Sequence, residues 1–311
     1  MTIVDAAYLN YRNGGLHNGV YEFDSLRQAV APLIGRAPAV LALCEGKRWL
    51  HKGSSGMNAA CAALDDALGR PYVGQAGWHR RGEYGPAIVW DPQVLSLITW
   101  SGADHRSNPL HDRNIAEFAV RGAPGKRLTM KIVHYPFDSG TERIAEAEQD
   151  ADRAGGDVPF ALVGDLNSTA SGAFLPQRNW LQVPLHKRRH KARLVDGKWV
   201  ADTRALDILI GEHDGTKVDD EHRVITRVNG AGFESLAELA FRAGMSSEQA
   251  FRPTTNSGVD SGGPLIIDWW LANPALAELF VPSSHEVHVP DGHYPSTWRL
   301  DHRMVSGQFA L

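Results

Sequence analysis

The chain has 311 residues, with 32 Lys and Arg against 36 Asp and Glu, for a formal net charge of −4. Its hydrophobic fraction of 43% and charged fraction of 22% are typical of a globular protein with a buried core, and they exclude disorder as the dominant state. The negative balance excludes a protein that grips nucleic acid duplexes through a broad basic surface. Any attraction to a polyanion must therefore be local or come from a bound metal.

Two cysteines, Cys44 and Cys61, are too few to indicate a disulfide framework. The N-terminus lacks a basic start and a long apolar run, so we expect no secretory signal and a cytoplasmic location. No segment approaches the ~20 apolar residues that span a bilayer.

Short apolar segments rich in β-branched residues recur along the chain and end at Gly, Pro, Asp or Asn, which is typical of strands. The clearest are Thr2–Leu9, Ala39–Cys44, Ala87–Trp90, Val94–Trp100, Ile115–Val120, Leu128–His134, Phe160–Val163, Leu265–Leu271 and Met304–Phe309. Helical periodicity predicts helices over Asp24–Ile34, Met57–Leu68 and Thr141–Ala154. Several strands follow one another without a helix between them, which favours mixed sheets flanked by helices over a parallel doubly wound sheet.

The segment 185–263 differs from the rest. It opens with the basic run His186–Arg193, continues through the charged stretch Gly211–His222, and predicts short helices over Gly232–Ala243 and Ser247–Phe251. We interpret it as an elaboration within one domain that spans residues 1–311. The basic run is either a solvated charged face or a surface that binds a polyanion through Lys187, Arg188 and Arg189.

Polar residues stand at the ends of the predicted strands, where burial does not explain them. Asp165 and Asn167 follow the strand that ends at Val163, and in extended backbone they point to the same side. Such a pair can deprotonate a water and hold it against a phosphate, or it can only form an Asx turn.

Other strands end in the same way. Asn10 closes the first strand, Glu45 follows the second, and Asp301 precedes the last, which together predicts a site with hard oxygen ligands for Mg²⁺. His134 ends a further strand.

Asp268 lies inside an apolar strand, where a carboxylate is costly unless it is paired. His302 is the natural partner, and such a pair fixes the imidazole tautomer and favours its cationic form.

The ordered set resembles the endonuclease/exonuclease/phosphatase superfamily, which includes DNase I and exonuclease III. The motifs Gly-Asp-Leu-Asn, Ile-Asp-Trp-Trp-Leu and the terminal Asp-His occur in the family's order, between residues 10 and 302. Leu9, Cys44 and Leu300 replace residues common in the family but no catalytic group.

The resemblance implies a four-layer α/β/β/α sandwich with two mixed sheets packed face to face. It implies a phosphoesterase that uses Mg²⁺, with Mn²⁺ as the alternative. The metal site would use Asn10, Glu45 and Asp301. The catalytic residues would be His134, Asp165, Asn167, Asp268 and His302.

Arg143 stands nine residues after His134, where the family often has an arginine, and it would either brace the site or lie in solvent.

The expected function is a nuclease that acts on DNA or RNA. The alternative is a phosphatase or phosphodiesterase for a small molecule or lipid headgroup, with residues 185–263 as a lid over its pocket.

Two other patterns carry less weight. Val-Asp-Ser-Gly-Gly-Pro-Leu at 259–265 resembles the nucleophile segment of trypsin-like proteases, but the histidine context and disulfides of that family are missing, so Ser261 is interpreted as part of a turn. His285, His288 and His293 match no standard zinc spacing and are expected at the surface.

Overall fold

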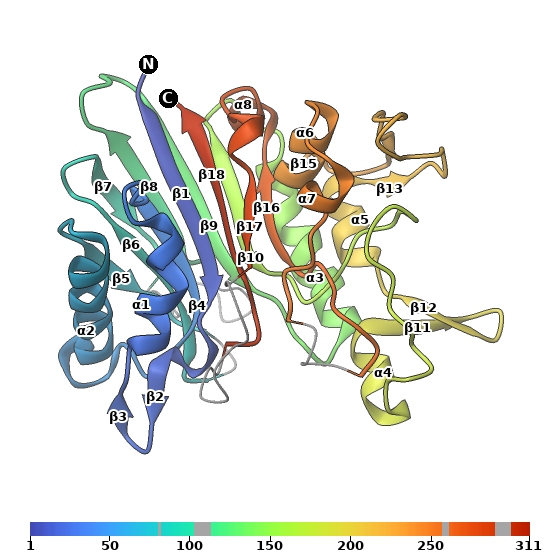
Figure 1. Ribbon diagram of the computed structural model, residues 1–311, viewed down its shortest axis with the longest axis horizontal. Coiled ribbons are helices and arrows are strands. Elements are labelled where there is room, and N and C mark those ends of the chain that lie inside the picture. Colours follow the sequence, from blue (N-terminus) through green and yellow to red (C-terminus); the bar gives the residue numbers. More distant parts are fainter. Residues whose placement is uncertain (80–81, 103–112, 257–260, 290–299) are drawn as a thin grey trace.

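The computed structural model describes residues 1–79, 82–102, 113–256, 261–289 and 300–311. Two six-stranded sheets form its centre (Figure 1). The first has the order β17-β18-β1-β4-β6-β5, with β1 Ile3–Asn10, β4 Val40–Lys47, β5 Val73–Ala76, β6 Tyr84–Trp90, β17 Glu286–His288 and β18 Met304–Ala310. The second has the order β15-β16-β10-β9-β8-β7, with β7 Leu95–Trp100, β8 Ile115–Val120, β9 Arg127–His134, β10 Phe160–Asp165, β15 Glu234–Ser235 and β16 Asp268–Ala272.

Each sheet is mixed. β1 pairs in parallel with β4, and β9 pairs in parallel with β10, whereas the other neighbours in the two sheets are antiparallel. Parallel neighbours bring their carboxyl ends to the same edge, so β1 and β4 end side by side, as do β9 and β10.

The two sheets bury their facing sides against each other. Along β1, Val4, Ala6 and Tyr8 belong to the core between the sheets, whereas Ala7 and Leu9 belong to the core under the helices. Successive side chains of a strand point to opposite faces, so a strand buried on both faces is a continuous apolar run.

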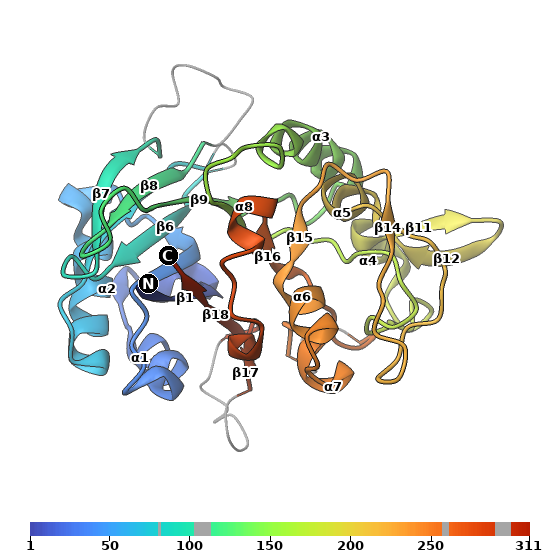
Figure 2. The same ribbon diagram turned by 90° about the horizontal axis from the view of Figure 1, so that it is seen from above.

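Helices cover the outer faces. Helices α1 (Asp24–Val30) and α2 (His51–Leu68) pack on the first sheet, and α3 (Gly140–Asp150), α5 (Arg204–Ile210) and α6 (Leu236–Arg242) pack on the second (Figure 2). The predicted four-layer α/β/β/α sandwich is confirmed.

The nine predicted strands are all present, with ends that shift by a few residues. Strand β16 begins at Asp268 instead of Leu265, because Leu265 accepts backbone hydrogen bonds from Thr254 and Thr255 in a loop. The first predicted helix is also shorter. It ends at Val30 and continues as a 3₁₀ turn over Ala31–Leu33.

The described part of the segment 185–263 forms several short elements. It forms α4 (Leu185–Lys191), the hairpin of β11 (Ala192–Val195) and β12 (Lys198–Ala201), helix α5, the pair of β13 (Glu212–His213) and β14 (Arg227–Val228), then β15, α6 and α7 (Ser247–Ala250). Leu206 and Leu209 of α5 are buried with Ala147 of α3, and β15 extends the second sheet. The segment therefore supplies part of the outer layer.

The remaining elements are short: the hairpin of β2 (Leu16–His17) and β3 (Val20–Tyr21), helix α8 (Pro274–Ala277), and 3₁₀ turns at Arg12–Gly15, Ala151–Arg153 and Pro282–Ser284. Within the described ranges, no helix combines the length and the hydropathy needed to cross a membrane.

His285 gives the fold a testable pH dependence. It is 6% exposed, its Nε2 lies 3.3 Å from the carbonyl oxygen of Ala250, and burial lowers its pKa to about 4. The unfolded chain binds a proton at His285 near pH 6.5, whereas the folded chain does not until about pH 4, so folding stability falls as the pH drops between these values. At about pH 5 the loss from this residue is about 2 kcal/mol.

His285→Gln keeps a donor for Ala250 and removes the titration. In urea unfolding at about pH 7.5 and about pH 5, we expect the variant to lose about 2 kcal/mol less than the wild type. His51→Gln, at an exposed histidine, is the matched control. Equal losses in the wild type and His285→Gln would show that His285 does not carry this dependence.

Candidate active site

Three of the predicted site residues meet through the register of the second sheet. Asp165, the last residue of β10, lies opposite His134 at the end of β9 and opposite Asp268 at the start of β16. The carboxyl ends of β9 and β10 and the amino end of β16 therefore place their polar side chains at one edge.

The first sheet brings Asn10 and Glu45 to the same place. Asn10 pairs with Cys44, so Glu45 follows directly beside it, where a register shift between Leu43 and Gly46 interrupts the β4–β6 ladder. Glu45 has a positive φ of 62°, a conformation that costs a non-glycine residue about 1–3 kcal/mol and is concentrated at functional sites. Its carboxylate accepts hydrogen bonds from the backbone N–H of Asn13 (3.0 Å) and from Nδ2 of Asn10 (3.4 Å).

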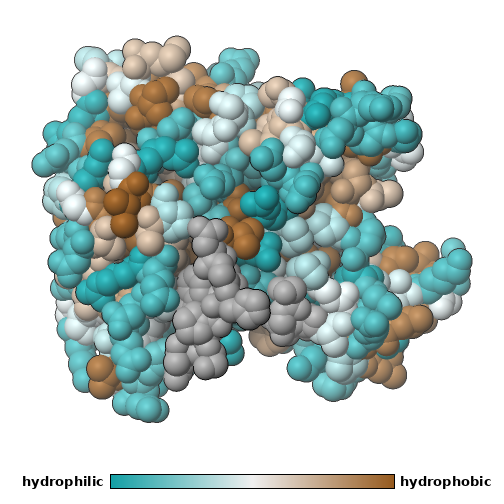
Figure 3. Space-filling model, viewed as in Figure 1, coloured by the Kyte–Doolittle hydropathy of each residue, from teal (hydrophilic) through white to brown (hydrophobic). Residues whose placement is uncertain are grey.

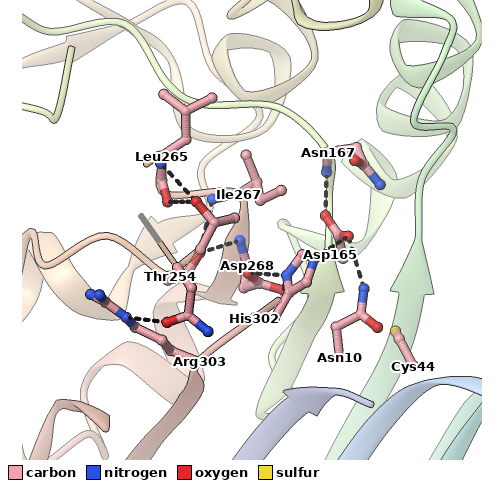
Figure 4. A network of polar contacts seen from close by, with 12 residues as sticks. Asn10, Cys44, Asp165, Asn167, Thr254, Leu265, Ile267, Asp268, His302 and Arg303 are labelled. Carbon is pink, nitrogen blue, oxygen red and sulfur yellow. Dashed lines mark hydrogen bonds and ion pairs between the residues drawn. The ribbon is translucent and has the colours of Figure 1, made fainter. Parts of the chain in front are cut away.

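Asp165 is the centre of the polar network (Figure 4). Its Oδ1 accepts the backbone N–H of Asn167 at 2.8 Å, and its Oδ2 accepts Nδ2 of Asn10 at 3.1 Å. The same Oδ2 lies 3.7 Å from Nε2 of His134 and 3.8 Å from Nε2 of His302. Oδ1 is thus bound by the backbone, and Oδ2, which Asn10 binds, also faces two imidazoles.

The expectation of extended backbone through Asn167 is wrong. Asn167 has a φ of 49°, and its Nδ2 donates to the carbonyl oxygen of Tyr135 at 3.0 Å. Asn tolerates this left-handed conformation because its short side chain bonds locally. The Asx turn that the sequence left open is present, and it fixes the carboxylate of Asp165.

Asp268 and His302 form the predicted pair. Nδ1 of His302 lies 2.8 Å from Oδ2 and 3.0 Å from Oδ1 of Asp268, whose backbone N–H donates to Oγ1 of Thr254 (Figure 4). Burial alone would lower the pKa of His302, but the carboxylates of Asp268 and Asp165 outweigh it and raise that pKa to about 10. At neutral pH His302 is therefore an imidazolium whose Nε2–H faces Asp165.

A cavity of about 410 Å³ opens beside this network. Its lining residues are Arg12, Asn13, Glu45, His79, Tyr84, His134, Tyr135, Phe137 and Asp301. Asp301 has a side chain that is 26% exposed and lies 3.9 Å from Nε of Arg12. Of the predicted site residues, Glu45, Asp301 and His134 line this cavity, whereas the rest of the network lies behind its wall.

His79 is one of the cavity residues that the sequence did not indicate. It is buried, and its Nε2 lies 3.3 Å from the carbonyl oxygen of His134. It follows no apolar strand directly, so only the tertiary structure reveals it.

The donor set of Asn10, Glu45 and Asp301 fits a hard divalent cation. Oδ1 of Asn10 is buried and has no hydrogen-bond partner among the residues that the structure describes, and Nδ2 of Asn10 is oriented by two carboxylates. A buried carbonyl oxygen is costly without a partner, which a cation would supply, and carboxylate oxygens complete the kind of set that Mg²⁺ prefers.

Asp165, Asp268 and His302 also bring three ligand atoms within 4.8 Å of one another. Nδ1 of His302 and the Asp268 carboxylate already bond each other there. The oxygen set is therefore the better candidate for the metal.

Arg143 does not lie in solvent. It is 1% exposed, and its Nη1 donates to the carbonyl oxygens of Pro136 at 2.9 Å and Phe137 at 3.5 Å. Burial lowers the pKa of Arg143, and its Nη2 lies 4.0 Å from Oδ2 of Asp202. It holds the loop after β9 in place and does not face the cavity.

The three residues of α4 predicted to bind a polyanion, Lys187, Arg188 and Arg189, differ in their surroundings. Arg188 donates to the carbonyl oxygens of Val183 and Leu181 and lies over the ring of Trp199, so it anchors the helix. Lys187 and Arg189 are exposed.

The two minor patterns give no second site. Oγ of Ser261 donates to the carbonyl oxygen of Gln182. His285 and His288 are buried, contrary to expectation, and they bond Ala250 and Ser306 respectively. His293 lies outside the described residues.

No family model and no curated protein matches this sequence. Solved structures match it along nearly its whole length. A humanized TDP2 from D. rerio has a TM-score of 0.54 and 14% identity over 99% of this chain and 98% of its own. The human Nocturnin catalytic domain with bound sulfate has a TM-score of 0.51 and 13% identity over 99% and 95%. The 3′ phosphatase NExo from Neisseria, bound to a product DNA hairpin, has a TM-score of 0.52 and 14% identity over 98% and 99%. Likeness at such identities establishes the fold, and this chain shares the α/β/β/α fold of these three proteins.

Proposed function

We propose that this protein is a Mg²⁺- or Mn²⁺-dependent phosphoesterase that hydrolyses phosphodiester bonds in DNA or RNA. One observation carries the proposal. Oδ2 of Asp165 lies within 4 Å of the imidazoles of both His134 and His302, beside the oxygen donors Asn10 and Glu45. Phosphoryl transfer depends mainly on positioning and on neutralising charge, and this arrangement supplies both.

Each residue of the site has a role in this proposal. Asn10, Glu45 and Asp301 would hold the metal, which neutralises negative charge on the phosphate when it is bound. Asp165 accepts the proton of the attacking water through Oδ2, while the backbone N–H of Asn167 fixes Oδ1.

The two histidines act on the phosphate. His302 donates Nε2–H to a phosphate oxygen as charge builds in the transition state, and Asp268 keeps it cationic. His134 contacts the same phosphate through Nε2.

The alternative is a phosphatase or phosphodiesterase for a small molecule or lipid headgroup. Under this alternative, residues 185–263 would form a lid over the pocket, but none of the described residues that line the cavity comes from that segment. The nucleic acid reading is also favoured because the NExo structure with this fold holds a DNA product. Rapid hydrolysis of a small phosphodiester with no cleavage of DNA or RNA would favour the alternative.

Glu45→Gln tests the metal assignment. The variant keeps the shape of the side chain and removes the charge, so we expect the dissociation constant for Mn²⁺ to rise about 10-fold to 100-fold in calorimetric titration. Asp268→Asn should keep the wild-type Mn²⁺ affinity, because Asp268 is assigned to His302. The reverse result would place the metal at Asp165, Asp268 and His302.

A further inference from the structure

The cavity wall carries an aromatic side chain that the mechanism does not use. Phe137 lines the cavity and is 59% exposed. Its loop is held by the buried Arg143, which donates to the carbonyl oxygens of Pro136 and Phe137. A ring that is both exposed and fixed loses little entropy when a flat partner stacks on it.

The same ring leads to the basic helix α4. Phe137 meets the ring of His190 edge to face, with centroids 5.7 Å apart. Beyond it, Lys187 and Arg189 are exposed, and neither forms an ion pair with the part of the chain that the structure describes. The anchored Arg188 leaves the helix little freedom to move them away. Figure 3 shows that the surface over α4 and the β11–β12 hairpin, at the lower right, is mostly hydrophilic with separate hydrophobic residues.

We propose that Phe137 and α4 bind an unpaired strand of the nucleic acid substrate, an inference that rests on the proposed function of the cavity. An unpaired base stacks on Phe137, while Lys187 and Arg189 contact the neighbouring phosphates. Stacking combined with cations along the backbone is how proteins bind single strands without reading their sequence. A duplex offers no free base face in its interior, so the surface favours single-stranded substrates or unpaired ends.

Binding of nucleic acid to this surface can be measured without catalysis. Fluorescence anisotropy compares the binding of a labelled single-stranded oligonucleotide with that of a hairpin whose stem contains the same sequence. Phe137→Ala should weaken single-strand binding about tenfold and hairpin binding much less, and Phe137→Trp should retain the affinity. Lys187→Ala combined with Arg189→Ala should lower the salt dependence of binding by about one to two released counterions. Ile34→Ala and Lys126→Ala, exposed residues of other elements, are the matched controls.

The failures of the two proposals are distinguishable. If the wild type binds single strands through Phe137 but hydrolyses no phosphodiester, the binding surface is supported and the proposed reaction is contradicted. A wild type that hydrolyses a simple aryl phosphodiester retains the reaction. If it then binds duplex as tightly as single strand, or if Phe137→Ala binds as the wild type does, the single-strand surface is overturned.

Discussion

We expect Asp165→Asn to reduce kcat for the proposed phosphodiester hydrolysis by about 10³-fold or more. The amide is nearly the same shape as the carboxylate, and its one oxygen can accept either the Asn167 backbone N–H or Nδ2 of Asn10, but not both. It cannot take a proton from water, and it no longer balances the imidazolium of His302. The measurement is single-turnover hydrolysis at saturating Mn²⁺, where a proton-transfer defect appears in the chemical step.

The control for Asp165→Asn is Asp157→Asn, an exposed carboxylate that should leave kcat unchanged. Thermal unfolding of both variants separates a chemical defect from loss of the fold. If Asp165→Asn is folded and retains more than about a tenth of the wild-type kcat, the general-base role falls.

The second large effect concerns Asp268 and His302. His302→Gln removes the donor to the phosphate, and we expect kcat to fall about 10²-fold to 10³-fold. Asp268→Asn should cost nearly as much, because the Asp268 carboxylate is bonded to Nδ1 of His302 and acts by keeping His302 oriented and cationic. It also breaks the buried Asp268–His302 pair by removing one partner, which costs about 3–5 kcal/mol of folding stability.

The double variant Asp268→Asn/His302→Gln decides whether the two residues act as a unit. If they do, its kcat is close to that of His302→Gln alone, because the second change removes nothing further. Additive losses would mean that Asp268 has a separate role, which would be compatible with a metal at Asp165, Asp268 and His302.

The apolar runs predicted the nine long strands because a strand buried on both faces is a continuous hydrophobic run. Hydrophobic periodicity and composition do not predict strands that are very short or that form a sheet edge only through a neighbour. β5, β15 and β17 were not predicted, because they are two to four residues long and form only where a neighbouring strand offers hydrogen bonds. The hairpin of β11 and β12 was missed because its basic and polar residues resemble a solvated loop.

The site was predictable where a polar residue ends an apolar strand, as at Asn10 and Asp165. Its geometry was not, because it depends on backbone turns that the sequence does not display. The left-handed conformations of Glu45 and Asn167 aim their side chains, and neither residue is a glycine that would signal such a turn. His79 and Phe137 join the site only through tertiary packing. The sequence left open whether Arg143 braces the site or lies in solvent. Its burial excludes the solvent position, and it bonds the loop after β9.

We propose above all that the polar strand ends form the site of a metal-dependent phosphodiesterase. The most direct test measures hydrolysis of an aryl phosphodiester and of a single-stranded oligonucleotide by the wild type over a titration of Mn²⁺ and Mg²⁺, then after EDTA. We predict activity that saturates with metal, stops with EDTA and is restored by added metal. Hydrolysis that persists in EDTA at the same rate, or no hydrolysis of either substrate at any metal concentration, would contradict the account.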